Sequence, residues 1–237
     1  MNPMIDYPVD GDTARGYLAN PQAGEGPGVI VLHAWWGLND FFKSLCDRLA
    51  RVGYVVFAPD LYAGSIANTV EEAQQLLDRL DPAETQARLL GAVRYLRSRV
   101  TEDHKGLGVV GFSLGGSWAL WLSCNRPEDI SAVVVFYGSD VADFAQSKAA
   151  YQGHFAEIDE WEPLENVRQM EAGLREAGRE VSFHFYPNAG HWFFEDNRAG
   201  SYDSEAAQQA WSRMLEFLHQ HLGPGQPASA GSLSPDG

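Results

Sequence analysis

Basic residues are scarce in this sequence of 237 residues, where 17 Lys and Arg stand against 32 Asp and Glu and give a formal net charge of −15. Such a charge repels the phosphates of nucleic acids and the anionic surface of membranes. We therefore expect neither nucleic acid nor membrane as a partner. Long apolar runs are missing as well, since no stretch approaches the roughly 20 residues of a spanning helix. Met1–Tyr7 contains no basic segment followed by an apolar one, which predicts a cytoplasmic protein.

Cysteine is also rare. The two cysteines, Cys46 and Cys124, lie in no C-x-x-C pair and in no disulfide framework, so we expect two buried free thiols. The H-E-x-x-H motif of many zinc sites does not occur among the seven histidines. We therefore expect no metal site and no cofactor.

The chain is nevertheless rich enough in apolar residues, at 45%, to form a substantial core. Its length suits one α/β domain, which we place at residues 1–222. From Gly223 onward the residues are mostly Gly, Pro, Ser and Ala, and this composition predicts a disordered tail over 223–237. We expect a monomer or a small homo-oligomer.

Continuous apolar, β-branched runs at Val29–Leu32, Tyr54–Ala58 and Ala132–Tyr137 are typical of strands buried on both faces of a parallel sheet. Segments with apolar residues at helical spacing separate these runs, which predicts a mostly parallel sheet with helices on both faces. Residues 61–82 form an excursion with a short helix that could partly cover a site as a lid. Further strands are expected near 14–19, 106–112, 149–155 and 181–186, and helices near 39–52, 82–100, 114–124, 163–177 and 203–222. Asn39 and Asp81 are the expected caps of the helices that start near 39 and 82, and a capping box at Thr69–Glu72 is expected to begin the short helix within 61–82.

The most informative motif is Gly111-Phe112-Ser113-Leu114-Gly115, which has the pattern G-x-S-x-G. An apolar run precedes it and an apolar segment follows, as expected of a strand, a tight turn and a helix. In this nucleophile elbow the serine hydroxyl stands clear of the sheet, while N–H groups at the helix start point toward a developing oxyanion. Ser113 is therefore the predicted nucleophile.

A serine nucleophile needs a base, and a neutral imidazole is the usual one. His191 follows an expected strand, comes directly after Gly190 and lies downstream of suitable acids, which gives the chain order Ser, acid, His. Asp159 is our choice for the acid that orients this imidazole. Asp140 is a competitor, because it follows the preceding strand.

Three of the remaining histidines receive other interpretations. His33 is expected to brace the loop that contains Trp35, while His219 and His221 lie where a helix C-terminus favours cations. The oxyanion would be bound by the backbone N–H of Leu114, directly after the nucleophile, and by that of Trp35 in the first loop.

These residues make the sequence similar to the dienelactone hydrolase family of α/β-hydrolases. The resemblance implies an α/β-hydrolase fold, hydrolysis of an ester or lactone, the triad Ser113, Asp159 and His191, and oxyanion donors at Trp35 and Leu114. It rests on the joint order of the segments Tyr17–Pro21, His33–Asn39, Ala58–Tyr62, Gly111–Gly116, His154–Asp159 and Ala189–Phe194.

The chain departs from this family at two positions. Well-known members have a cysteine nucleophile in Gly-Tyr-Cys-Leu-Gly-Gly, where this chain has Ser113, and a glutamate in the first loop, where it has Ala34. A mechanism that depends on a gated thiol therefore does not transfer. Family enzymes hold a substrate carboxylate with arginine, for which Arg198 is the candidate.

The sequence thus predicts a serine hydrolase that cleaves carboxylic esters or lactones of a small molecule through an acyl-enzyme. Trp36, Tyr62 and Trp192 are candidates for contacts with the substrate, and such aromatic walls favour small apolar or aromatic acyl groups over long-chain lipids. Two alternatives remain open: a non-catalytic binding protein on the same fold, and a peptidase or acyltransferase with the same triad.

Overall fold

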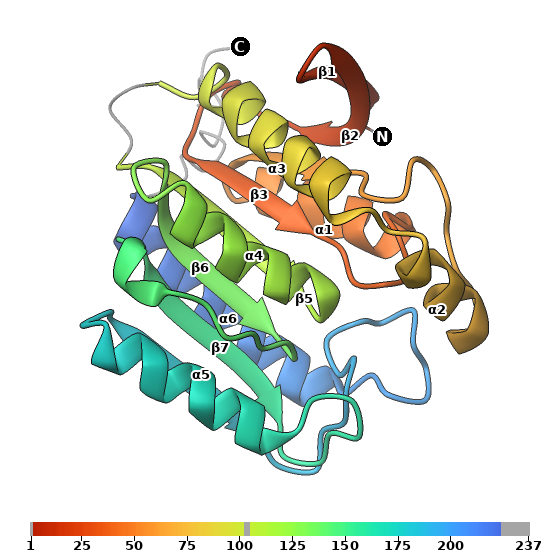
Figure 1. Ribbon diagram of the computed structural model, residues 1–237, viewed down its shortest axis with the longest axis vertical. Coiled ribbons are helices and arrows are strands. Elements are labelled where there is room, and N and C mark those ends of the chain that lie inside the picture. The colour runs from red at the N-terminus through yellow and green to blue at the C-terminus, as the bar shows by residue number, and fades with distance from the viewer. Residues whose placement is uncertain (1, 102–104, 224–237) are drawn as a thin grey trace, which may run out of the picture.

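The computed structural model describes residues 2–101 and 105–223, in which eight strands form one twisted sheet (Figure 1). The strand order is β1-β2-β4-β3-β5-β6-β7-β8. Strands β3 to β8 run parallel to one another, whereas β2 pairs antiparallel with both β1 and β4. The strands span Met4–Val9 (β1), Asp12–Ala19 (β2), Gly28–Leu32 (β3), Val55–Pro59 (β4), Leu107–Phe112 (β5), Ile130–Phe136 (β6), Ala150–Ala156 (β7) and Val181–Tyr186 (β8).

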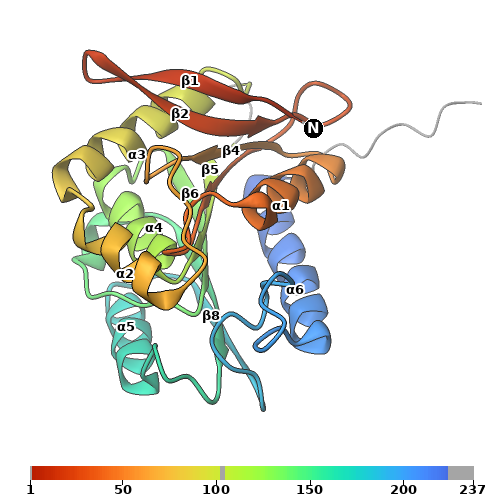
Figure 2. The ribbon, with the colours of Figure 1, turned by 90° about the vertical axis from the view of Figure 1, so that its right-hand side faces the viewer.

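Helices cover both faces of the sheet, as Figure 2 shows. On one face lie α1 (Asp40–Arg51) and α6 (Ser204–Leu222), and on the other lie α3 (Pro82–Arg97), α4 (Leu114–Asn125) and α5 (Leu164–Glu176). The short helix α2 (Val70–Asp78) precedes α3, and a 3₁₀ turn spans Phe144–Gln146. This arrangement confirms the predicted α/β fold, a mostly parallel sheet with helices on both faces.

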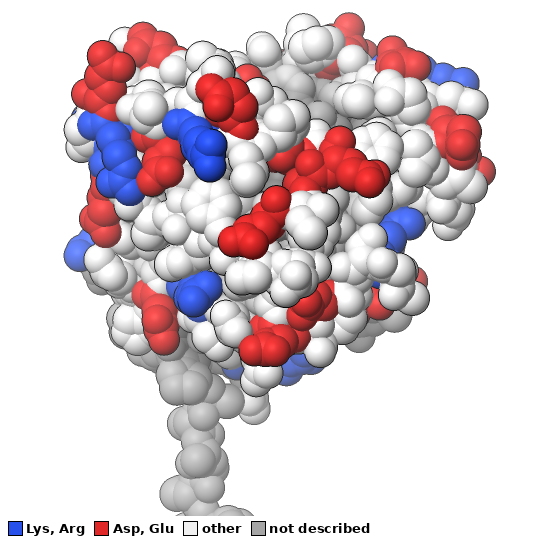
Figure 3. Space-filling view, turned by 90° about the horizontal axis from the view of Figure 1, so that it is seen from below, with Lys and Arg blue, Asp and Glu red and all other residues white. Residues whose placement is uncertain are grey.

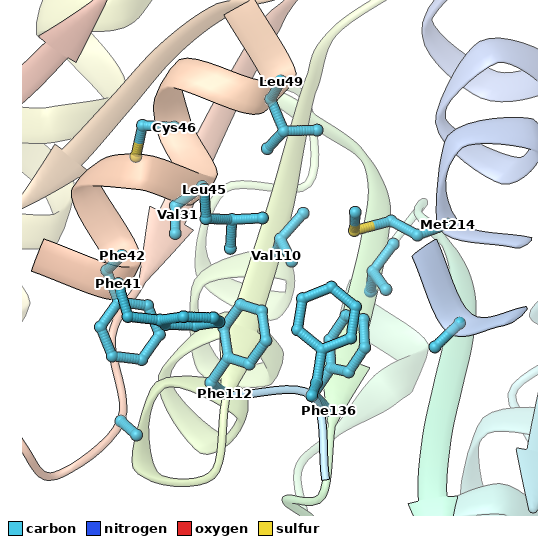
Figure 4. Packing of buried hydrophobic residues seen from close by; sticks show 14 of the residues in the cluster. Val31, Phe41, Phe42, Leu45, Cys46, Leu49, Val110, Phe112, Phe136 and Met214 are labelled. Atoms are coloured by element: carbon cyan, nitrogen blue, oxygen red, sulfur yellow. The ribbon is translucent and has the colours of Figure 1, made fainter. Parts of the chain in front are cut away.

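The core lies in two layers, one on each side of the sheet. Every residue of β5 is buried. Between the sheet and the helices α1 and α6, the rings of Phe112 and Phe136 stack at 4.6 Å, with Phe42 and Met214 in the same cluster (Figure 4). Burial of each such side chain contributes about 1.5–3 kcal/mol. The layers therefore fix the carboxyl end of β5, from which the elbow emerges.

Side-chain caps begin the helices where the sequence predicts. Asn39 accepts from the N–H groups of Phe41 and Phe42 at 3.0 and 3.4 Å, and Asp81 accepts from Ala83 and Glu84 at 2.7 and 3.0 Å. Such caps satisfy N–H groups that have no partner within the helix.

The capping box at the start of α2 differs in one detail from the usual form. Thr69 accepts from the N–H of Glu72 at 3.2 Å, as a capping box requires, but the Glu72 carboxylate accepts from the N–H of Asn68 at 2.8 Å. In the usual box this second bond goes to the capping residue itself. The bond still links the helix start to the chain that enters it.

Strand β1 is absent from the sequence prediction, in which the first strand is expected near 14–19. The segment Met4–Val9 alternates between exposed and buried positions toward its end, with Tyr7 and Val9 facing the core. Pro8 weakens the strand pattern because proline cannot donate to a ladder, yet an edge strand tolerates it. β1 is such an edge strand, at the end of the strand order and paired with β2.

Other sequence predictions have mixed outcomes. Cys46 is buried and free, whereas the free thiol of Cys124 is only half-buried near the end of α4. The expected tail over 223–237 lies, except for Gly223, outside the described residues. Over the described parts of the chain, none of the helices combines the length and apolarity that crossing a membrane requires.

The surface reflects the acidic composition. Figure 3 shows one face, on which carboxylates are spread among uncharged residues and only a few basic groups appear. Exposed ion pairs such as Arg15–Asp6, at 3.5 Å, contribute about 0–1 kcal/mol each. The fold is therefore stabilised chiefly by its two apolar layers.

Candidate active site

Four loops meet at the carboxyl ends of the parallel strands. They follow β3, β5, β7 and β8, and they carry Trp35, Ser113, Asp159 and His191. The carboxyl ends of parallel strands share one edge of a sheet, where α/β proteins build their sites. Residues that are far apart in the sequence are thus brought together by the topology.

Ser113 occupies the turn between β5 and α4 in a strained conformation, with φ 49° and ψ −114°. Positive φ values are uncommon for residues with a side chain and cost about 1–3 kcal/mol. The Ser113 N–H donates to the Phe136 carbonyl at 2.9 Å, and the N–H of Gly116 donates to the Ser113 carbonyl at 2.7 Å. These bonds hold the turn in place and leave the half-buried Ser113 side chain at the site.

The two glycines of the motif are required by close backbone approach. A Cβ on Gly111 would lie 2.2 Å from the carbonyl oxygen of Gly115, and a Cβ on Gly115 would lie 2.3 Å from that of Leu32. Both separations are well below van der Waals contact. Helix α4 therefore begins directly against β3 and β5 only because these positions lack side chains.

His191 bridges the other two residues. Its Nε2 lies 3.2 Å from Oγ of Ser113, and its Nδ1 lies 2.9 and 2.8 Å from the two carboxylate oxygens of Asp159. The side chains of His191 and Asp159 are only 5% and 2% exposed. Because a carboxylate only accepts, Nδ1 carries the proton and Nε2 is free to accept the proton of Ser113.

Asp159 is itself held by its own loop. Its Oδ1 accepts from the N–H groups of Trp161 and Glu162, each at 2.9 Å. The competitor Asp140 is exposed and accepts from the N–H of the adjacent Val141 at 2.7 Å. Of the two acids, Asp159 alone has a hydrogen bond to His191 among the described contacts.

The loop after β3 is oriented by His33. Burial lowers the pKa of His33, which keeps the ring neutral. Its Nε2 accepts from the N–H of Leu61 at 3.2 Å, so the proton lies on Nδ1, which donates to the Ala34 carbonyl at 2.7 Å. In a planar trans peptide the N–H points opposite to the carbonyl. With the Ala34 carbonyl held by His33, the Trp35 N–H is directed the other way.

Four tryptophans form a cluster beside these residues. The Trp35 ring lies 5.3 Å from Trp36, 5.2 Å from Trp161 and 6.3 Å from Trp192, measured between centroids. The Trp192 ring also lies 5.3 Å from that of Trp36 and 5.5 Å from that of Trp161. A cavity of about 440 Å³ opens next to them, lined by Trp161, His191 and Trp192 together with residues from the loops after β7 and β8.

The other candidates for substrate contact lie in two separate places, Trp36 with Arg198 and Tyr62 with His33. Trp36 is buried, and the guanidinium carbon of Arg198 lies 3.5 Å from its ring centroid. The Arg198 Nε is buried without a protein acceptor. Tyr62 packs against His33 at 5.3 Å and lines a second cavity, of about 230 Å³, with Arg88. His191 lines the first cavity but not the second, and Ser113 lines neither of the two.

Sequence reasoning overlooked two residues next to His191. Tyr137 follows β6, its ring lies 4.9 Å from the imidazole, and its hydroxyl donates to Glu195 at 2.8 Å. Both side chains are fully buried. The position of Tyr137 at a strand's carboxyl end was an available signal. The isolated acid of Glu195 after Trp192-Phe193-Phe194 was another.

The described residues offer no group of side chains suited to binding a metal ion. Within residues 2–101 and 105–223, no three or more His, Cys, Asp or Glu side chains are grouped so that they could hold a metal ion. The chemistry of the arrangement is that of a hydroxyl, an imidazole and a carboxylate in line.

The sequence and the fold of the chain are similar to those of known proteins. Residues 14–222 match the Dienelactone hydrolase family. Protein usf of Aquifex pyrophilus is 33% identical over 233 residues, covering 94% of this chain and all of that protein. A putative carboxymethylenebutenolidase of Aquifex aeolicus is 29% identical, with the same coverage of both chains. The crystal structure of a putative dienelactone hydrolase from Klebsiella pneumoniae superposes with a TM-score of 0.83 at 27% identity, covering 93% of this chain and 99% of that one.

Proposed function

The chain belongs to the dienelactone hydrolase family and is a carboxylic-ester hydrolase; from this premise we propose that it hydrolyses esters or lactones with Ser113 as nucleophile, through an acyl-enzyme. The observation that carries the proposal is the continuous line from Asp159 through His191 to Ser113, with distances of 2.8 and 3.2 Å. A serine hydroxyl reacts with a carbonyl only when a base accepts its proton.

In the proposed first step, Oγ of Ser113 attacks the substrate carbonyl while Nε2 of His191 accepts the hydroxyl proton. The imidazolium that forms is stabilised by the Asp159 carboxylate. The tetrahedral oxyanion accepts hydrogen bonds from the N–H groups of Leu114 and Trp35. His191 then gives its proton to the leaving alcohol, and an ester between Ser113 and the acyl group remains.

In the second step a water molecule loses a proton to His191 and attacks the acyl carbonyl. The same two N–H groups stabilise the second oxyanion. When this intermediate collapses, the bond to Oγ of Ser113 breaks, His191 returns its proton to that oxygen, and the acid is released. All groups required for both steps belong to this chain, so the proposed reaction needs no cofactor.

The proposed substrate is a small ester or lactone with an aromatic or compact apolar part. The cavity of about 440 Å³ beside His191 suits a small molecule, and Trp161 and Trp192 offer aromatic surface there. Arg198, stacked on Trp36 with a buried Nε that has no protein acceptor, supports a substrate that also carries a carboxylate.

The decisive experiment compares the wild type with Ser113→Ala in the hydrolysis of phenyl acetate and in labelling by an alkyl fluorophosphonate. We expect kcat to fall by about 10⁴-fold or more in the variant. We also expect a single covalent adduct on Ser113 of the wild type. Normal hydrolysis by Ser113→Ala would refute the nucleophile.

The same experiment tests the alternatives. A wild type that neither hydrolyses the ester nor reacts with the fluorophosphonate would favour a binding protein. Labelling with preferential transfer of the acyl group to an amine or alcohol would favour an acyltransferase, and faster cleavage of amides than of esters would favour a peptidase.

A further inference from the structure

Glu195 is a carboxylic acid that the proposed mechanism does not use. It lies four residues after His191 and is fully buried. Its Oε1 accepts from the Tyr137 hydroxyl at 2.8 Å, whereas its Oε2 is buried without a partner in the protein. A buried carboxylate with one hydrogen bond is costly, and such a group persists mainly where it has a function.

Tyr137 connects this acid to the site. Its ring lies 4.9 Å from the imidazole of His191 at an interplanar angle of 55°. Its backbone has a strained φ of 38°, and its N–H donates to the His154 carbonyl at 2.9 Å. Burial and the neighbouring Glu195 raise the pKa of Tyr137 well above its ordinary value, so the hydroxyl remains a donor. The contacts therefore run from Glu195 through Tyr137 to His191.

Charged groups face this contact from several elements. The positive charge of Arg198, on the same loop, lowers the pKa of Glu195. The negative charge of Asp159, on the loop after β7, raises the pKa of Tyr137. Burial raises the pKa of Glu195 to about 7, while Tyr137 and Arg198 oppose the rise. The charge of this acid therefore changes near neutral pH.

We propose that Glu195 is a positioning residue for His191: its carboxylate, through the Tyr137 hydroxyl, fixes the ring that packs against the imidazole, and its negative charge favours the imidazolium that forms when Ser113 attacks. The inference rests on the proposed function. It adds a second acid to the site, one that touches neither the substrate nor the imidazole directly. In a low-dielectric interior such a charge acts more strongly than it would in water.

The substitution Glu195→Gln tests this proposal. The glutamine carbonyl still accepts from Tyr137 but cannot ionise, so the variant imitates the protonated acid at every pH. Two readouts are used, kcat/KM for phenyl acetate and the rate of fluorophosphonate labelling of Ser113. Near pH 8.5 we expect the variant to be about three- to tenfold slower than the wild type in both. Near pH 5.5, where Glu195 of the wild type is also neutral, we expect the two proteins to agree.

If Glu195 had a purely structural role, the rate of the variant divided by that of the wild type would be the same at pH 5.5 and at pH 8.5. A variant-to-wild-type ratio that does not change with pH, whether it is below one or equal to one, would therefore overturn the proposal. If the wild type reacts with neither reagent at any pH, the proposed function fails as well. A reactive wild type with a constant ratio leaves that function intact.

Tyr137→Phe provides a second test. The ring remains against His191, but Glu195 loses the donor that stabilises its charge, so the rise in activity with pH should move to higher pH. Tyr151→Phe is the matched control, since this buried tyrosine bonds to Ser123 and Ser147 and to no carboxylate. A pH profile of Tyr137→Phe identical to that of the control would contradict the proposed link.

Discussion

Nε2 of His191 lies 3.2 Å from Oγ of Ser113, although 78 positions separate the two residues in the chain. The contact depends on three elements at once: the strained turn after β5, the loop after β8, and the parallel pairing of β5 to β8 through β6 and β7. Hydroxyl and base are therefore already within hydrogen-bond reach before any substrate binds.

The acid of the proposed triad is tested by Asp159→Asn. The amide can no longer hold the imidazole with its proton on Nδ1, so kcat should fall by about 10³- to 10⁴-fold with little change in KM. Asp140→Asn is the control, because Asp140 is exposed and bonds only within its own turn. Steady-state kinetics of both variants decide between the acids. A crippled Asp140→Asn beside an active Asp159→Asn would reverse the assignment.

His33 is predicted to orient the Trp35 N–H through the Ala34 carbonyl. His33→Ala should lower kcat by about 10- to 100-fold, because one oxyanion donor is no longer held in place. It should also lower the free energy of unfolding by about 1–3 kcal/mol, since the buried Leu61 N–H loses its acceptor.

The control for this loop is His33→Asn, whose amide nitrogen can still donate to the Ala34 carbonyl. We expect kcat of His33→Asn to exceed that of His33→Ala while both lose stability. Kinetics together with urea unfolding separate the two effects. An unchanged kcat in His33→Ala would show that the loop does not need this residue.

The close approach of α4 to β3 predicts a steric effect. In Gly115→Ala the new Cβ would lie 2.3 Å from the Leu32 carbonyl oxygen, which belongs to the backbone and cannot rotate away. We expect a loss of about 2–4 kcal/mol in the free energy of unfolding. In the control Gly173→Ala, also within a helix, the nearest atom is Cδ2 of Phe144 at 3.4 Å. Its stability should be unchanged or higher by up to about 1 kcal/mol. Equal effects of the two substitutions on urea unfolding would be inconsistent with the close packing.

Glu195 has a further consequence for stability. A carboxyl group whose pKa is raised from 4.5 to about 7 binds its proton more tightly in the folded chain. Its favourable contribution is complete below pH 4.5 and is lost as the pH rises through 7, by about 3 kcal/mol in all. We therefore compare the free energy of unfolding of Glu195→Gln with that of the wild type at each pH. This difference should favour the variant by about 3 kcal/mol more near pH 8 than near pH 4.5. Urea unfolding at both pH values measures the difference, and a difference of zero or of opposite sign would contradict the buried, ionisable state.

Trp161 is expected to set the preference for aromatic substrates. Its side chain is 47% exposed at the cavity and contacts Trp35 and Trp192. Trp161→Ala should lower kcat/KM for phenyl acetate about three- to tenfold relative to ethyl acetate. Trp118→Ala is the control, since this tryptophan packs against Trp121 on α4 and does not line the cavity. A uniform loss for both esters would mean that Trp161 serves stability rather than selectivity.

Local patterns were sufficient for much of the fold. The apolar runs predict β3 to β6 because strands buried on both faces need no polar alternation, and the caps at Asn39 and Asp81 locate the starts of α1 and α3. β1 was missed because Pro8 breaks its pattern, and whether a strand lies at an edge depends on its neighbours rather than on its own residues.

For the candidate site, the sequence by itself determined which groups are present: a serine between two glycines, a histidine after a late strand, and two acids that could serve it. Only the tertiary structure decided that the acid beside His191 is Asp159 rather than Asp140, and that a buried Glu195 lies behind Tyr137. Those outcomes depend on distances between loops that are far apart in the chain, and such distances are set by how the strands pair and how the side chains pack.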